Sequence, residues 1–365
     1  MMKTRGSRIA ILSVLLLGLI IFGIVYFAWN TAFDIFQPAS SPPGTTVPVR
    51  IYPGESTAQI ASDLQNKGLI RNALAFRIWA RIKGLDTSLQ AGGYNHLNTS
   101  MTISDIINKL LTAQPDVLYV SIPEGWRIQQ IAAQFAAAGL AKFSEKDFLS
   151  YTLHPSTFPD FGKYPVLKFI PHGDSMEGLL FPATYPIPVD GDARVVVNQM
   201  LTAFDNYVAQ YNLVAKAKAH NLNEYQMVIL ASLVQREINN LQDAGGVASV
   251  YWNRIYKPAE GTVGLLQSDP SVEYARDSET NPAKYWTPLN DIGDNIAKNS
   301  PWNTYINKGL PPTPICSPGL ATLQAAAAPP TTSYYYFLGK PSDGRIVFAT
   351  TPQEFQQDIQ KYLQG

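Results

Sequence analysis

The feature that most constrains this chain is a charge-free apolar run near its beginning, Ile9–Trp29, which follows Lys3, Arg5 and Arg8. As an α-helix rising 1.5 Å per residue, the run is about 30 Å long, which matches the hydrocarbon thickness of a bilayer. Basic residues beside a membrane span stay on the cytoplasmic side. We therefore predict a cytoplasmic N-terminus at 1–8, a single-pass transmembrane anchor over the apolar run, and the rest of the chain outside the plasma (inner) membrane.

The end of the apolar run bears on whether the segment is removed. A cleaved signal peptide has a shorter apolar core and a small-x-small cleavage site, whereas this run ends in Tyr26, Phe27 and Trp29. We favour an uncleaved anchor and keep cleavage, which would release a soluble secreted protein, as the alternative. Residues 30–47 contain a Pro-, Ser- and Thr-rich stretch and are predicted to form an extended linker.

An internal repeat follows the linker. Residues 51–70 align without gaps on residues 121–140 at an offset of 71, and each copy has the pattern of a strand, a Gly turn, an amphipathic helix and a Gly that stops the helix. The six identical pairs begin with Gly54 and Gly125 and end with Leu69 and Leu140. We interpret this as one small βα unit used twice; chance similarity between two such units is the alternative.

Helices surround a few short strands in the rest of the chain, which predicts an α+β fold. Helices are expected at 71–83, 101–113, 192–212, 213–221, 224–238, 243–257 and 352–364, and a hairpin at 333–339 and 345–350. We divide the chain beyond the linker into an N-terminal subdomain (48–117), a second βα unit with its connecting segment (118–190), and a C-terminal domain (191–365).

Composition excludes several classes of function. Lys plus Arg and Asp plus Glu number 28 each, so there is no basic excess to indicate nucleic acid as a partner. The chain has one cysteine, Cys316, and four scattered histidines, which give no disulfide and no metal-ligand spacing. We predict neither a metal site nor a cofactor.

The helix predicted at 224–238 carries the most informative carboxylate, Glu237. An apolar stripe is expected along this helix, formed by Met227, Leu230, Ala231, Val234 and Ile238. At 100° per residue, Glu237 lies within about 20° of Leu230 and so on the buried face, with Gln235 and Arg236 pointing away. Burial raises the pKa of a carboxyl group, as a general acid near neutral pH requires. A structural ion pair with Arg254 is the alternative.

Two polar segments supply side chains suited to sugar hydroxyl and acetamido groups. Gln267, Ser268 and Asp269 are predicted to stand at the end of a strand that Pro270 terminates. A second set precedes a Pro-rich turn and comprises Asn303, Thr304 and Tyr305. Either set alone is also typical of an ordinary loop.

These segments together resemble the endolytic murein transglycosylase family, the MltG or YceG-like proteins. The resemblance runs from about residue 48 to 362 and rests on ordered blocks at 122–126, 177–185, 229–237, 247–254, 266–274, 300–305, 309–315 and 334–337. It implies a LysM-like N-terminal portion, a catalytic C-terminal domain and Glu237 as the catalytic residue. Glu177 and Tyr185, which lie in one of the blocks, join Gln267, Ser268, Asp269, Asn303, Thr304 and Tyr305 as candidate substrate-binding residues.

The chain departs from the family pattern at a few positions. Gln235 stands where many members carry a second Glu, so that one carboxylate remains on the helix motif. Ala183, Thr313 and Ser317 replace the usual residues of loop blocks, and the segment 276–299 is longer than usual and is a candidate lid.

The family implies cleavage of the β-1,4 bond between N-acetylmuramic acid and N-acetylglucosamine inside a glycan strand, giving a 1,6-anhydro end. One carboxyl group serves as acid and then base. Two alternatives remain: a muramidase with Asp269 or Glu177 as second carboxylate, and a non-catalytic membrane-anchored scaffold that binds peptidoglycan. The expected partners are peptidoglycan glycan strands, the membrane through the N-terminal helix, and peptidoglycan synthases.

Overall fold

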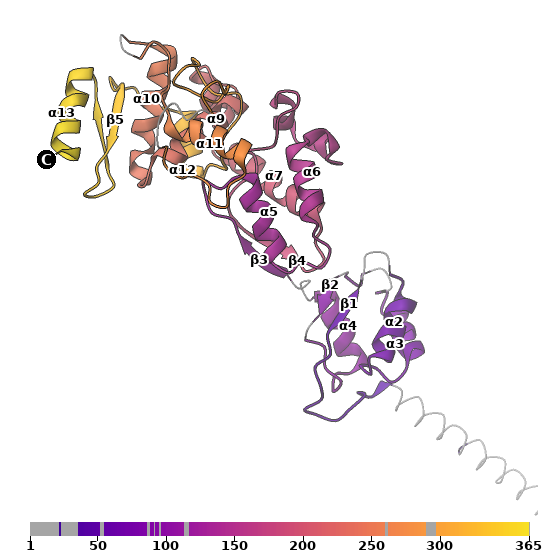
Figure 1. Ribbon diagram of the computed structural model, residues 1–365. Helices are drawn as coiled ribbons and strands as arrows, with labels where there is room; N and C mark the ends of the chain where they lie inside the picture. The colour runs from indigo at the N-terminus through magenta and orange to yellow at the C-terminus, as the bar shows by residue number, and fades with distance from the viewer. Residues whose placement is uncertain are drawn as a thin grey trace, which may run out of the picture. The chain divides into compact units, whose positions relative to one another are not determined.

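The computed structural model describes residues 22, 36–51, 55–85, 88–90, 92–94, 96–112, 117–259, 262–289 and 297–364. The contacts divide the chain into two compact units, Met1–Val117 and Leu118–Gly365, each of which is described by itself (Figure 1). Among the described residues, no helix combines the length and apolarity needed to cross a membrane. The predicted anchor at 9–29 lies outside these residues except for Phe22.

The first unit contains two short strands, which pair with each other, and three helices. Strands β1 (Val49–Ile51) and β2 (Gly92–Tyr94) are antiparallel, with Val49 opposite Tyr94. The helices are α2 (Thr57–Asn66), α3 (Ala73–Ile82) and α4 (Ile103–Thr112), and their buried faces share one apolar core.

The second unit begins with a similar arrangement. Strand β3 (Val117–Ser121) pairs with β4 (Thr184–Pro188), and between them lie α5 (Ile128–Ala137), α6 (Glu145–Leu153) and three 3-10 turns, η1 (Pro155–Thr157), η2 (Phe161–Lys163) and η3 (Pro165–Phe169). Helix α5 packs on α6, as α2 packs on α3 in the first unit.

The predicted repeat has the same local structure in both copies. Helices α2 and α5 are each ten residues long, and their first and last residues differ by the predicted offset of 71. Near the N-terminus of each helix, a glutamine side chain (Gln59 or Gln130) accepts the backbone N–H three residues earlier, at 2.8 and 3.1 Å. Gly68 and Gly139 follow the helices with φ of +69° and +78°, a conformation that glycine adopts without strain. Gly54 of the first copy lies outside the described residues.

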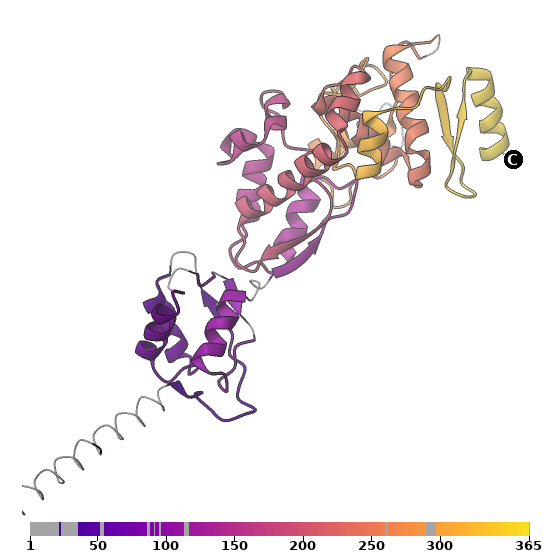
Figure 2. The same cartoon turned by 180° about the vertical axis from the view of Figure 1, so that it is seen from behind.

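The remainder of the second unit is mainly helical. In order, it contains α7 (Ala193–Gln210), α8 (Leu213–Ala219), α9 (Glu224–Glu237), η4 (Leu241–Asp243), α10 (Ala244–Tyr256), α11 (Asp269–Thr280), α12 (Leu320–Ala327), β5 (Tyr336–Gly339), β6 (Ile346–Ala349) and α13 (Pro352–Leu363). The antiparallel β5–β6 hairpin is confirmed, and α13 packs on it at the edge of the unit (Figures 1 and 2). Together with the strand pairs of both units, these elements confirm a mixed α+β fold.

Helix α9 is the centre of the second unit. It packs against α8, α10, α11 and α12, and every residue from Met227 to Val234 is buried. The predicted single apolar stripe was therefore too narrow, because neighbouring helices enclose α9 on all sides until its last turn. One apolar cluster includes residues from both sides of position 190, for example Ile131 and Leu230.

The expected strand end at Gln267–Asp269 is wrong. Asp269 and Pro270 instead begin helix α11, with proline in the first turn. The missing proline N–H costs nothing there, because the first helical N–H groups have no intrahelical acceptor. Leu265 forms only an isolated bridge with Lys308. The proline thus starts a helix rather than ending a strand.

Gly178 offers a direct test of this packing. Its φ is +81°, and an added Cβ would overlap Pro314 and lie 3.0 Å from Val228 of α9. Gly178→Ala should lower the free energy of unfolding by about 1–3 kcal/mol, through backbone strain and overpacking. The control is Gly162→Ala, whose Cβ would meet nothing within 4 Å. Denaturant titrations compare the two, and equal stability of the variants would contradict the packing described here.

Candidate functional site

Glu237 is the last residue of α9, where the buried helix reaches a polar cluster. Its Oε1 accepts the hydroxyl of Tyr251 at 2.5 Å and that of Ser268 at 2.8 Å. Tyr251 comes from α10, and Ser268 is the residue before α11. Three elements that are separate in sequence therefore meet at one carboxylate oxygen.

The environment of Glu237 favours its neutral form. Burial of the carboxyl group is the main cause that raises its pKa; the hydroxyls of Tyr251 and Ser268 oppose the rise. The nearby Asp269 carboxylate also raises the pKa, and Arg254 lowers it. The position at a helix C-terminus acts in the same direction as burial, because the partial negative charge of the last carbonyls disfavours a carboxylate. Glu237 thus has the properties of a general acid.

Tyr251 was not found by sequence reasoning. It is fully buried on α10, and its ring meets the edge of Phe337 at a centroid distance of 5.7 Å. Burial and the neighbouring Glu237 raise the pKa of its phenol well above the usual value, which keeps the hydroxyl protonated as a donor. The available signal was helical spacing: Tyr251 lies three residues before Arg254 and so on the same side of the helix.

Arg254 does not form the ion pair considered as the alternative for Glu237. In the described part of the chain, its guanidinium donates to the backbone carbonyls of Leu266 and Tyr335 and, at 3.4 Å, to Gln267 Oε1. No salt bridge joins it to Glu237 there. Arg254 instead holds the segment that carries Ser268 against the β5 edge.

A second set of hydrogen bonds fixes the same segment from the other side. Thr304 accepts the Gln267 N–H through its carbonyl at 3.1 Å and the Ser268 N–H through its hydroxyl at 2.9 Å. Gln267 is held at φ +53°, an uncommon conformation for a residue with a side chain. This bend places the Ser268 hydroxyl on Glu237. Thr304 and Gln267 therefore position the site.

Asp269 and Tyr305 form a pair on the exposed side of this cluster. Tyr305 donates its hydroxyl to Asp269 Oδ1 at 2.5 Å, and Asp269 is exposed. Asn303 serves the loop: its amide donates to the carbonyls of Ala297 and Lys298, and its Oδ1 accepts the Tyr305 N–H at 3.0 Å. Of the predicted residues, Gln267, Ser268, Asp269, Thr304 and Tyr305 thus gather near Glu237, while Asn303 is a buried support.

Glu177 lies in a different environment. It is buried beside the N-terminus of α5, where it accepts the Ile128 N–H at 3.2 and 3.4 Å. Burial raises the pKa of Glu177 to about 7, against the opposing effect of Arg127. Glu177 is not among the groups that bond to or shift Glu237.

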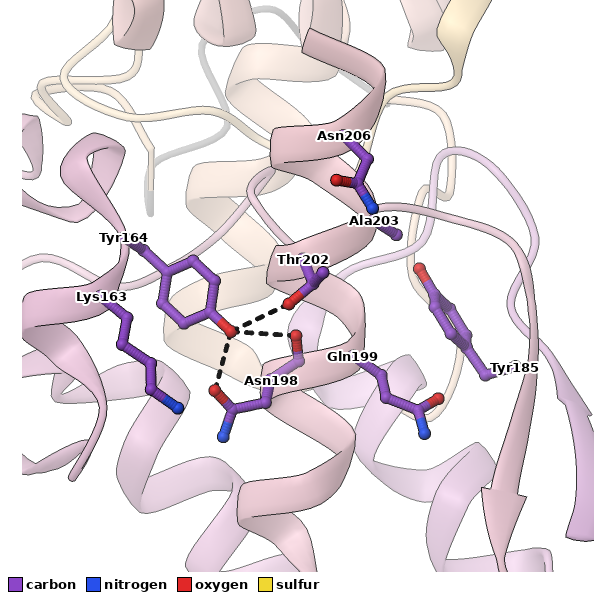
Figure 3. A pocket seen from close by; sticks show the side chains of 8 residues that line it. All are labelled: Lys163, Tyr164, Tyr185, Asn198, Gln199, Thr202, Ala203 and Asn206. Atoms are coloured by element: carbon purple, nitrogen blue, oxygen red, sulfur yellow. Dashed lines mark hydrogen bonds between the residues drawn. The ribbon is translucent and has the colours of Figure 1, made fainter. Parts of the chain in front are cut away.

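Tyr185 also lies apart from Glu237. It is on β4, donates its hydroxyl to the Phe181 carbonyl at 2.5 Å, and lines an open pocket of about 550 Å³ beside α7. Figure 3 shows this pocket, in which Tyr164 donates to Asn198 Oδ1 at 2.7 Å and lies 3.1 Å from Thr202 Oγ1. No residue of the Glu237 cluster lines it.

Gln235 and Arg236, the two residues before Glu237, are expected to point away from the buried face of α9, and both contact neighbouring segments. Gln235 accepts the Gly319 N–H and the Thr322 hydroxyl, both at 2.9 Å, at the start of α12. Arg236 lies over the Trp286 ring at 4.2 Å. Trp286 belongs to the segment considered as a lid, of which residues 290–296 lie outside the described residues. Both neighbours of Glu237 therefore anchor the end of α9.

Among the described residues, no group of three or more His, Cys, Asp or Glu side chains is placed to hold a metal ion.

Comparison with known proteins gives the same family from sequence and from structure. The model of the YceG-like family matches residues 49–361. The endolytic murein transglycosylase of Bacillus subtilis (strain 168) is 32% identical over 341 residues, which cover 90% of this chain and 88% of that protein. That of Streptococcus pneumoniae serotype 2 is 27% identical over 362 residues, covering 93% of this chain but 62% of the longer pneumococcal protein.

A crystal structure of a yceG-like protein from Listeria monocytogenes aligns with 86% of this chain and 99% of its own, at 29% identity and a TM-score of 0.55. The family match spans most of the chain and includes every residue of the Glu237 cluster. The chain therefore belongs to the YceG-like family.

Proposed function

We propose that this chain is an endolytic peptidoglycan lytic transglycosylase in which Glu237 acts first as general acid and then as general base. The observation that carries the proposal is one carboxyl group with a raised pKa, held by two hydroxyl donors in a polar cluster. The relatives named endolytic murein transglycosylase support the reaction and the substrate class.

The hydrogen bonds indicate where the catalytic proton resides. Tyr251 and Ser268 both donate to Oε1, and no described side chain or backbone group donates to Oε2. The proton of the neutral acid therefore sits on Oε2. When Oε2 gives up this proton, the two hydroxyls stabilise the negative charge left on the carboxylate.

The reaction needs one carboxyl group in two steps. Glu237 gives its proton to the glycosidic oxygen, the bond from that oxygen to C1 of the muramic acid breaks, and an oxocarbenium-like centre develops at C1. The Glu237 carboxylate then removes the proton of the C6 hydroxyl as O6 bonds to C1. A 1,6-anhydro end forms, the acid is restored, and no water is consumed.

The position of the other carboxylates disfavours hydrolysis. A hydrolase needs a second carboxylate facing the scissile bond to activate water or to act as nucleophile. Glu177 is buried against α5, and Asp269 is engaged by Tyr305. Near Glu237, Asp269 is exposed and Gln267 and Tyr305 are half-buried, and these three residues are proposed to contact the sugars. Asn303 and Thr304 are buried and support them.

The proposal also assigns roles to the N-terminal part of the chain. Residues 9–29 anchor the chain in the plasma membrane with the N-terminus in the cytoplasm, and the strand–helix–helix–strand units are LysM-like and bind glycan. Anchoring restricts cleavage to strands near the bilayer, where peptidoglycan synthases are the expected partners. The apolar run and the repeated unit support these assignments. A non-catalytic glycan-binding scaffold is the second candidate.

Glu237→Gln tests the catalytic assignment. The amide keeps the shape of the side chain but cannot donate the acidic proton, so release of glycan fragments should fall by about 10²–10⁴-fold or more. Glu224→Gln, at the other end of α9, is the matched control and should stay active. Mass spectrometry of digested glycan strands measures both the rate and the anhydro end.

The products also separate the alternatives. Reducing ends without the anhydro mass would identify a hydrolase. Wild-type protein that binds glycan strands yet releases no fragments would identify a scaffold. Normal cleavage by Glu237→Gln would remove Glu237 from the mechanism.

Tyr251→Phe tests the role of the hydroxyl donors. Because a hydrogen bond to Oε1 favours the carboxylate, losing it should raise the pKa of Glu237 further. The acid form then persists to higher pH, so the alkaline limb of the kcat/KM profile should move upward in pH while the maximal rate falls about tenfold. The control is Tyr256→Phe, on the same helix as Tyr251: it removes a hydroxyl that donates to the Asn221 carbonyl and should leave the profile unchanged. An unmoved or lowered limb in Tyr251→Phe would contradict the assignment.

A further inference from the structure

Helix α3 in the first unit carries an apolar stripe on its exposed side. Leu74, Ile78 and Ile82 recur at four-residue spacing and are 58%, 45% and 69% exposed. The opposite side of the same helix is buried in the core through Ala75, Phe76 and Ala80. Three large exposed aliphatic side chains in one row are more than the scattered apolar residues of an ordinary surface.

Basic residues are frequent in and beside α3. Residues 64–85 contain five basic side chains and no acidic one. They are Lys67, Arg71, Arg77, Arg81 and Lys83, all exposed. Arg77 and Arg81 lie next to Leu74 and Ile78 along a groove of about 310 Å³ between α3 and the start of α2. Basic and aliphatic side chains on one helix face are typical of helices that lie in the headgroup region of an anionic bilayer.

The described residues that follow the predicted anchor contact the first unit at this same helix. Phe36 packs on Trp79 of α3, with ring centroids 5.8 Å apart. Six residues lie between Phe36 and Trp29, the end of the predicted anchor, so the two are seven Cα–Cα steps apart. Even when fully extended, seven steps span only about 25 Å. The tether therefore keeps α3 close to the membrane surface.

From these three observations we propose that the exposed face of α3 docks on the anionic phospholipid surface of the membrane in which the chain is anchored. The proposal rests on the anchor in the proposed function and adds a second contact to it. Leu74, Ile78 and Ile82 enter the headgroup region, and the basic residues in and beside α3, Arg77 and Arg81 first, bind lipid phosphates. Each basic residue near an anionic leaflet strengthens binding by about fivefold. The docking fixes which side of the first unit faces the bilayer.

The test uses the full chain reconstituted into vesicles of phosphatidylcholine, with or without phosphatidylglycerol. A fluorophore is attached at Ile78→Cys in a Cys316→Ala background, and the control carries it at Lys109→Cys, an exposed position on α4. A nitroxide quencher on the lipid acyl chains should quench the label at position 78 in phosphatidylglycerol vesicles and leave that at position 109 unquenched. Reversing charge with Arg71→Glu and Arg77→Glu should abolish this quenching.

The outcomes separate this proposal from the proposed function. Equal quenching at positions 78 and 109, or quenching at 78 that is independent of phosphatidylglycerol, would overturn the anionic-lipid contact. A label at position 78 that is already shielded in detergent would show that protein covers the face, which also overturns it. Glycan cleavage by the charge-reversed variant is measured separately in detergent, where it should equal that of the parent. If neither the variant nor its parent cleaved glycan, the proposed enzymatic function would be wrong, and the proposed docking face would be unaffected.

Discussion

The site depends on the bonds that Tyr251 and Ser268 donate to one oxygen of Glu237. A carboxyl group at the end of a buried helix is costly as an anion and has little to hold it in place as a neutral acid. Two hydroxyls reduce that cost and fix the orientation of the group. They also leave the second oxygen, Oε2, to carry the proton. The same two hydrogen bonds suit a carboxyl group that acts first as an acid and then, as a carboxylate, as a base.

Much of the second unit serves to keep these donors in position. Arg254 clamps the Leu266 and Tyr335 carbonyls, and Thr304 holds Gln267 and Ser268 by their N–H groups. The strained backbone of Gln267 persists because it is fixed from both sides. The end of α9 is held in the same way, by Gln235 on α12 and by Arg236 on Trp286. Thr304 and Asn303, which resemble substrate contacts in the sequence, are therefore supports.

Sequence patterns predicted those features that depend on residues close together in the chain. Helical phase placed Glu237 towards the interior, and Gly68 and Gly139 marked the ends of two helices with identical spacing. Pairings between distant segments could not be read in this way. The burial of α9 on all sides results from four helices that sequence periodicity does not bring together. Proline is compatible with both a strand end and a first helical turn, so Pro270 alone does not distinguish the two in the sequence. Glu177 and Tyr185 are candidate substrate contacts only because they lie in the block at 177–185. The fold places both away from Glu237.

The central claim is that the protein raises the pKa of the Glu237 carboxyl and so favours its acid form. Carbon-13 NMR of glutamate side-chain carboxyl groups, with the Glu237 signal assigned by its loss in Glu237→Gln, follows its titration directly in the intact protein. The account predicts that Glu237 titrates at a pH above that of an ordinary glutamate, because burial outweighs the two hydroxyl donors. A titration at or below the ordinary value would show that the site does not favour the acid form and would contradict this claim.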